Sequence, residues 1–165
     1  MGLDPISEDK YADFAKQLFK QYGKSLDDDV VPQVYHRFNG VTAYLQRIMN
    51  VLFMNTERGG RCTADVIEDA IDFIINLNFE HYETMFSQMS EKQRQAFLAI
   101  ATEKRAKNIS GSEFVHKYRL MTPSSVVSAV KGLMEKDFIT QENNEYYVYD
   151  YFFPVWLVKK GYIIS

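Results

Sequence analysis

Apolar residues recur at helical spacing along the first half of the chain and predict four helices there. The stripes fall in residues 8–22, 30–38, 44–55 and 63–86, and the last of these helices is the longest, with Thr63 expected as its cap. Gly23 follows the first stripe as a C′ residue, because glycine adopts positive φ without a steric penalty. The stripe of the first helix comprises Tyr11, Phe14, Ala15, Leu18, Phe19 and Tyr22. These patterns indicate a four-helix bundle.

The second half of the chain carries clear signals for three helix starts. Residues 90–93 and 110–113 both fit the capping box, in which two side chains satisfy backbone N–H groups that lack helical partners. Thr122 is expected to cap a third helix that begins at Pro123 and runs to about Lys136. Its apolar face is predicted to comprise Val126, Val127, Val130, Leu133 and Met134. Its polar face would carry Ser124, Ser125, Ser128, Lys131 and Glu135.

Two strand-like segments follow this helix. Residues 138–141 and 146–149 are rich in β-branched and aromatic side chains, and the asparagines of residues 142–145 tolerate the backbone of a tight hairpin. Three helices followed by a hairpin are the element order of a winged helix-turn-helix. The predicted fold is therefore mainly α, with a four-helix bundle in residues 1–89 and a winged helix-turn-helix with a small β-hairpin wing in residues 90–165.

The third helix of such a fold can lie in the DNA major groove, while nearby basic side chains bind phosphate. The expected phosphate contacts are Lys107, Lys117, Arg119, Lys131 and Lys136, with Ser124, Ser125 and Ser128 near the bases. Glu142 and Glu145 at the wing tip would repel phosphate, and serine is a weak base reader. We therefore expect weak, largely nonspecific binding to double-stranded DNA. The alternative is a winged helix that docks a protein and does not contact DNA.

Charge and length set limits on these expectations. The 165 residues, 46% of them apolar, can form a substantial core, and the net charge is −3. Residues 1–89 carry −6 and residues 90–165 carry +3, so the second half is better suited to a polyanion. No apolar stretch approaches the roughly 20 residues that span a bilayer. With one cysteine and no secretion signal, a cytoplasmic location without membrane contact is expected.

Several short motifs resemble nucleotide-binding, metal-binding or catalytic sequences, but the surrounding residues do not fit these functions. Residues 23–25 match the end of a phosphate-binding P-loop, but Leu18 stands where that motif requires glycine. The aspartates at 27–29 are explained by the dipole at a helix start and need no metal ion. Neither Cys62 nor the three histidines, His36, His81 and His116, show metal-ligand spacing. We expect no catalytic residue and no bound metal, although a Cys62 nucleophile with a histidine partner stays open as an alternative.

The segment Val34-Tyr35-His36-Arg37-Phe38-Asn39-Gly40-Val41-Thr42-Ala43-Tyr44-Leu45-Gln46 resembles the C-terminal part of archaeal-type and Bacteroides-type AAA+ ATPases. Further matches occur at Cys62-Thr63, Ala99-Ile100-Ala101, Ser124-Ser125-Val126, Tyr147-Val148-Tyr149-Asp150 and Trp156-Leu157. The resemblance implies a helical lid in residues 1–89 and an appended winged helix in residues 90–165. The Walker A and Walker B motifs of that family lie upstream of the matching region, so this chain is not expected to hydrolyse ATP alone.

The resemblance also implies partners and a nucleotide-sensing turn. The full-length protein would bind ATP and Mg, and the winged helix would couple its nucleotide state to DNA. The expected partners are an upstream ATPase domain, double-stranded DNA, and a protein partner or a second copy of the chain. Gly40, Thr42 and Arg47 map onto the turn that approaches nucleotide in that family. A helix that ends at Gly40 and another capped by Thr42 explain the first two residues without nucleotide.

Overall fold

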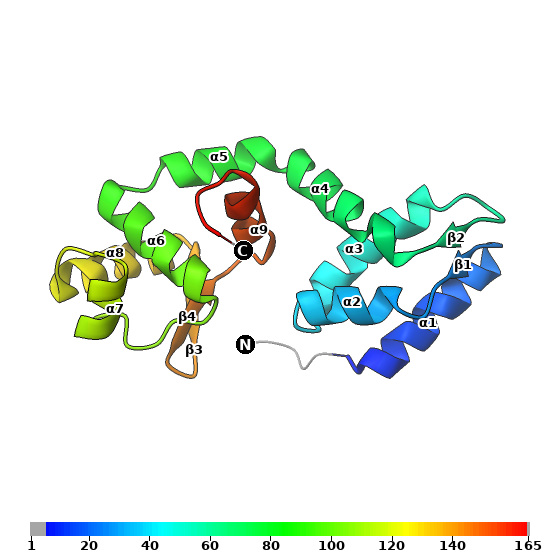
Figure 1. Ribbon diagram of the computed structural model, residues 1–165, viewed down its shortest axis with the longest axis horizontal. Coiled ribbons are helices and arrows are strands. Elements are labelled where there is room, and N and C mark those ends of the chain that lie inside the picture. Colours follow the sequence, from blue (N-terminus) through cyan, green and yellow to red (C-terminus); the bar gives the residue numbers. More distant parts are fainter. Residues whose placement is uncertain (1–5, 165) are drawn as a thin grey trace. The chain divides into compact units, whose positions relative to one another are not determined.

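The computed structural model describes residues 6–164, and the chain divides into two compact units between Leu77 and Asn78 (Figure 1). This division precedes residue 89, where the sequence predicts the domain boundary. The predicted fourth helix is also interrupted here, because Asn78 adopts φ −109° and ψ 13° between two separate helices. Asparagine favours such positions since its side chain competes with helical hydrogen bonds. The helix therefore does not continue to Phe86 without a break.

The first unit consists of helices and a short parallel ladder. Its elements are α1 (Glu8–Gln21), β1 (Ser25–Leu26), α2 (Val30–Arg37), α3 (Thr42–Asn55), β2 (Arg61–Cys62), the 3-10 helix η1 (Ala64–Val66) and α4 (Ile67–Leu77). α1 packs against α2 and β1, and α3 packs against α4. Ser25 pairs with Arg61 and Leu26 with Cys62. This ladder was not predicted, because two-residue strands show no periodicity.

Two details of the first unit differ from the sequence prediction. Phe14 and Tyr22 were assigned to the apolar stripe of the first helix but are 59% and 52% exposed, whereas Tyr11, Ala15 and Phe19 are buried. Thr63 was expected to cap a long α-helix, but its side chain makes no capping hydrogen bond and instead bonds to the carboxylate of Asp65. The chain there first forms η1, and α4 follows it.

The predicted end of α1 is confirmed in detail. Gly23 has φ 72°, its N–H donates to the carbonyl of Lys20 at 3.0 Å, and the N–H of Lys24 donates to the carbonyl of Phe19 at 2.9 Å. This pair of bonds is the Schellman motif, which satisfies carbonyls that lack helical partners. The same motif ends α7 and α8, described below, with Arg119 at φ 53° and Asp137 at φ 59° in place of glycine.

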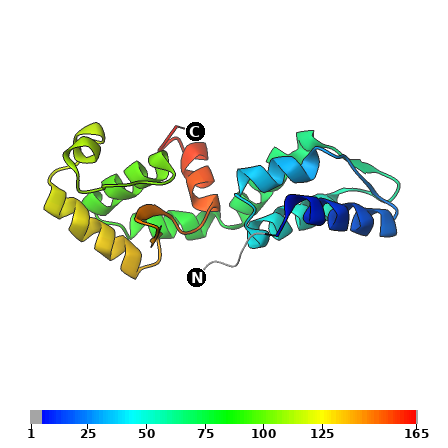
Figure 2. The ribbon, with the colours of Figure 1, turned by 90° about the horizontal axis from the view of Figure 1, so that it is seen from below.

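The second unit contains the predicted order of three helices followed by a hairpin, with one further helix before it and one after it. Its elements are α5 (Phe79–Ser87), α6 (Glu91–Glu103), α7 (Ser112–Lys117), α8 (Pro123–Glu135), β3 (Ile139–Glu142), β4 (Glu145–Val148) and α9 (Phe152–Lys159). Both α8 and β4 contact α6, α7 contacts α8, and α9 contacts α5 (Figures 1 and 2). The mainly α fold with a winged helix-turn-helix is thereby confirmed.

Aromatic side chains from α5, α6 and α9 form the core around Trp156. The centroid of its ring lies 6.0 Å from that of Tyr82 and 5.7 Å from that of Phe153, and all three residues are at most 1% exposed. The hydroxyl of Tyr82 donates to Asp150 Oδ2 at 2.8 Å, while Asp150 Oδ1 accepts the backbone N–H of Phe152 at 2.9 Å. Asp150 thus joins α5 to the start of α9. α9 was not predicted from the sequence.

One of the two predicted capping boxes is present. Ser90 Oγ accepts from the backbone N–H of Gln93 at 3.2 Å, and Gln93 Oε1 accepts from the N–H of Ser90 at 3.0 Å. The box predicted at Ser110 is absent, because a turn closed by the bond from Gly111 N–H to the Asn108 carbonyl makes Gly111 the N-cap. α7 therefore begins at Ser112. The Thr122 cap is confirmed, since its hydroxyl accepts from the N–H of Ser125 at 3.1 Å.

The hairpin has a tighter turn than predicted. Ile139 pairs with Val148, and Glu142 pairs with Glu145, which leaves only Asn143 and Asn144 in the loop. Their φ values of 53° and 63° are those of a two-residue turn whose twist matches the flanking strands. Both glutamates are therefore strand residues, directly opposite each other beside the turn.

The two serines provide a matched test of helix capping. We expect Ser90→Ala to lower the free energy of unfolding by about 1 kcal/mol, because it removes one side of a formed capping box. Ser110→Ala should change it by less than about 0.5 kcal/mol, since no capping bond is lost. Urea unfolding followed by circular dichroism measures both variants. Equal effects of the two substitutions would contradict this assignment of the helix starts.

Candidate nucleic-acid interface

The face of α8 turned away from α6 is mostly polar but includes one exposed valine. Ser124, Ser128 and Lys131 are exposed, as predicted. Val127 was assigned to the buried face but is 52% exposed, because its position on the helix places it among these polar residues. Ser125 is half-buried and accepts a hydrogen bond from the Thr122 hydroxyl at 2.9 Å, so its side chain helps to hold the cap. The exposed face thus has Val127 in place of Ser125 and is less polar than the sequence suggested.

Three of the predicted phosphate contacts are exposed around α8. Arg119 lies at the C′ position of α7, Lys131 lies on α8, and Lys136 is the C-cap of α8. Within residues 6–164, none of these side chains forms an ion pair with a carboxylate. Basic side chains placed around such a helix are suited to bind the phosphate backbone.

Lys117 is paired with a carboxylate of its own unit. Its Nζ lies 2.8 Å from Glu103 Oε1, which also accepts a hydrogen bond from the Tyr118 hydroxyl at 2.6 Å. These two hydrogen bonds lower the pKa of Glu103, that from Lys117 contributing most. The pair therefore stabilises the fold above the usual glutamate pKa of about 4.3, and this contribution is lost as the pH falls through the lowered value. A phosphate would compete with Glu103 for Lys117.

Lys107 is likewise paired, in this case with the wing. Its Nζ lies 3.3 Å from Glu145 Oε1, and the neighbouring Arg105 lies 4.0 Å from Glu142 Oε2. The guanidinium of Arg105 also stacks on the ring of Tyr147, 3.7 Å from its centroid. Arg105 was not among the predicted site residues, because no sequence pattern relates it to the hairpin. Its proximity to the wing results from pairing between segments 40 residues apart.

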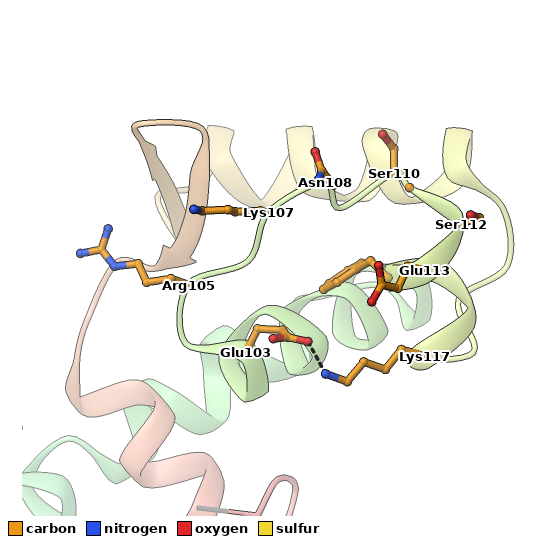
Figure 3. Close-up of a pocket in the computed structure, with 10 residues that line it drawn as sticks. Glu103, Arg105, Lys107, Asn108, Ser110, Ser112, Glu113 and Lys117 are labelled. Atoms are coloured by element: carbon orange, nitrogen blue, oxygen red, sulfur yellow. Dashed lines mark hydrogen bonds and ion pairs between the residues drawn. The ribbon is translucent and has the colours of Figure 1, made fainter.

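A hollow of about 680 Å³ lies between the end of α6, the following loop and α7. Its lining residues are Glu103, Arg105, Lys107, Asn108, Ser110, Gly111, Ser112, Glu113, Phe114 and Lys117. In Figure 3 the heads of Arg105 and Lys107 extend to the side of the hairpin, while Glu103 and Lys117 face each other across the lower part. Two carboxylates and a paired lysine make this hollow a poor phosphate site, so the phosphate contacts are better sought outside it.

The division of the chain at Leu77 also changes its charge distribution. Residues 78–165 carry 11 basic and 10 acidic side chains, a net charge of +1, because Glu80 and Glu83 belong to the second unit. The predicted division at residue 89 gave +3. Affinity for DNA rises with the number of phosphates neutralised by cations, so the second unit has little long-range attraction for a duplex.

The residues expected to sense nucleotide do not share one helical face. Gly40 is buried with φ 70°, and its N–H closes the end of α2 on the carbonyl of Tyr35 at 2.9 Å. Thr42 is the first residue of α3 and not its cap, which is Val41, so the expectation of a threonine cap is wrong. Arg47 follows five positions later, which is about 140° around the helix from Thr42. The backbone conformation of this turn is explained by the way in which α2 ends at Gly40.

The structure assembles no metal site and no activated thiol from the described residues. Groups of three or more metal-ligating side chains are lacking in residues 6–164. His36 is exposed beside Glu8, with 3.1 Å between Nε2 and Oε2. Cys62 is 1% exposed, and its burial raises the pKa of the thiol. A thiol that is buried and uncharged is a poor nucleophile.

Each helix in the described residues is also too short or too polar to cross a membrane.

Comparison with known proteins agrees with this fold. A family model described as a probable winged helix domain matches residues 80–159. Among solved structures, a chain described as a Walker-type ATPase of Pyrococcus abyssi superposes with a TM-score of 0.64 at 15% sequence identity. The match covers 93% of the present chain and 42% of that chain, so the present chain spans less than half of its length. Curated proteins gave no match. Residues 80–159 thus have a winged-helix fold, and the fold of most of the chain recurs in part of a Walker-type ATPase.

We expect Cys62 to react slowly with a maleimide at neutral pH. Its rate should be on the order of a hundredfold below that in urea, because a buried thiol of raised pKa reacts only after local opening. Mass spectrometry of the intact protein measures the labelling. His36→Ala and His81→Ala serve as controls, and a rapid reaction that either substitution slows would reveal an activated thiol and contradict this expectation.

Proposed function

We propose that this chain is the noncatalytic C-terminal part of a Walker-type ATPase and that its winged helix makes weak, nonspecific contact with double-stranded DNA. The observation that carries the proposal is the arrangement of three exposed cations around α8, Arg119, Lys131 and Lys136, which have no carboxylate partner among residues 6–164. ATP and Mg would be bound by an upstream ATPase domain, whose nucleotide state the winged helix would couple to DNA. The similarity to part of a Walker-type ATPase supports this placement.

The character of the contact follows from the same residues. Ser124 and Ser128 are the hydroxyl side chains on the exposed face of α8, and both can bond to any base edge or to a phosphate. No arginine, asparagine or glutamine of α8 is present to form the bidentate base contacts that discriminate strongly. The phosphate contacts would therefore supply most of the affinity, and sequence preference would be slight.

Three phosphate contacts predict a defined salt dependence. The logarithm of the binding constant falls with the logarithm of salt concentration with a slope near −0.9 per contact, which gives about −2.7 here. Between about 50 and 200 mM salt the affinity should then fall roughly 40-fold. Fluorescence anisotropy of a labelled random duplex, titrated with the chain, measures this slope.

A charge-reversal variant tests which residues are responsible. Arg119→Glu combined with Lys131→Glu should weaken binding at 50 mM salt by about tenfold or more and reduce the slope to about −0.9, since one contact remains. Lys10→Glu combined with Lys20→Glu is the matched control, because both lysines are exposed on the first unit and the total charge changes equally. Equal weakening by the two variants would attribute binding to net charge and not to α8.

A second candidate function is favoured by the apolar residues near α8. Met121 is 65% exposed and Val127 is 52% exposed, although burial of such apolar side chains lowers the free energy. A protein-docking or regulatory winged helix would use this surface to contact the upstream ATPase domain or another protein. No binding of a folded sample to the duplex at 50 mM salt would overturn the DNA proposal and leave docking as the function.

A further inference from the structure

The wing brings two like charges together. Glu142 and Glu145 are the last pair of the hairpin ladder, and their side chains emerge on the same face of the sheet because directly opposite residues share a face. Like charges in such a pair destabilise a hairpin. Cations nearby are therefore needed to offset this repulsion.

The cations come from the loop that follows α6. This loop pairs with β4 at one residue and so adds a short third segment to the wing. Ala106 and Tyr146 exchange two backbone hydrogen bonds, each 2.8 Å long. The side chain of Ala106 is buried, so its neighbours Arg105 and Lys107 emerge together on the opposite side. This single bridge places one cation beside each wing glutamate, Arg105 beside Glu142 and Lys107 beside Glu145.

Two further contacts direct Arg105 to the wing. Its guanidinium stacks on Tyr147, and the Tyr147 hydroxyl donates to Glu142 Oε2 at 3.2 Å, the oxygen that Arg105 also approaches. Arg105 also reaches the hydroxyl of Tyr151 at 3.5 Å. The carboxylate, the phenol and the guanidinium thus form one cluster at the surface of the wing. The Glu142 carboxylate remains accessible, since its side chain is 59% exposed, whereas the side chain of Glu145 is 27% exposed.

We infer that Glu142 and Glu145 weaken the binding of this winged helix to DNA by competing with DNA phosphates for Arg105 and Lys107. The inference rests on the proposed DNA contact. With both carboxylates in place, the cations of the wing are neutralised within the chain, and only the cations around α8 act on a duplex. Removal of the carboxylates adds two phosphate contacts. Arg105 and Lys107 are thereby assigned to a second phosphate-binding surface, whose ligand is the phosphodiester backbone.

The test is Glu142→Gln combined with Glu145→Gln in the full chain, with anisotropy measured on the same random duplex. Five contacts in place of three predict a salt slope of about −4.5 in place of −2.7, and about tenfold or more tighter binding at 50 mM salt. The substitutions remove the repulsion between opposite residues, so the hairpin should remain folded. Circular dichroism verifies this for each sample.

Two controls separate the wing from overall charge. Glu80→Gln combined with Glu91→Gln changes the net charge equally at exposed residues of α5 and α6 that have no ion pair within residues 6–164, and its slope should stay near −2.7. Adding Arg105→Ala and Lys107→Ala to the wing variant should return the slope to that of the unchanged chain.

The outcomes distinguish this inference from the proposed function. If the unchanged chain binds with a slope near −2.7 and the wing variant matches the charge control, the inference is overturned and the DNA contact stands. Binding by the wing variant alone would support the inference and overturn the proposal that the unchanged chain contacts DNA. If neither binds at 50 mM salt, both are overturned.

Discussion

The contact between α6 and α8 determines which residues this winged helix presents to a partner. Gly132 lies in that contact, and a β-carbon there would lie 2.5 Å from Gln93 Nε2, well inside van der Waals distance. The same Gln93 side chain closes the capping box at the start of α6. The orientation of α8 about its own axis therefore depends on the position of the Gln93 side chain at the start of α6. With Val126 and Val130 turned inward, Val127 and Lys131 must face outward.

The wing depends on a different kind of constraint, which is electrostatic. Surface ion pairs such as those of Arg105 and Lys107 contribute little to stability individually, commonly about 0–1 kcal/mol each. Their importance here is that they determine the sign of the potential beside the hairpin. Basic residues near a helix-turn-helix are poor evidence for DNA binding until their carboxylate neighbours are known. Lys107 and Lys117 were indistinguishable from Lys131 in the sequence, and the folded chain separates them by their partners.

The sequence predicted those features that depend on neighbours within one or two helical turns. The capping box at Ser90, the Thr122 cap and the glycine end of α1 all require only local hydrogen bonds, and each is confirmed. The fold of the second unit could be predicted because helix periodicity and hairpin composition are also local signals. The box at Ser110 failed because Gly111 offered the chain an alternative turn.

The missed features depend on contacts between distant segments. α9 lacks a distinct apolar face in the sequence, since seven of its eight residues are apolar although only four of them are buried, and so periodicity does not reveal it. The pairing of Arg105 with Glu142 joins residues 37 positions apart, and the bridge at Ala106 that produces it is a single residue pair. Val127 was misassigned because it directly follows Val126, and consecutive residues lie about 100° apart around a helix, so burial of Val126 turns Val127 outward. The candidate DNA-contacting residues thus remain a prediction from the sequence, and their charge balance required the structure.

Trp156 is the only tryptophan of the chain, and it lies in the second unit, within its aromatic core. The emission of this indole therefore reports on the winged helix alone, whereas backbone spectroscopy averages over both units. Comparing the two signals during unfolding would show whether the units lose structure in one transition or in two. The chain thus contains an intrinsic probe of whether the helical unit and the winged helix form one cooperative system.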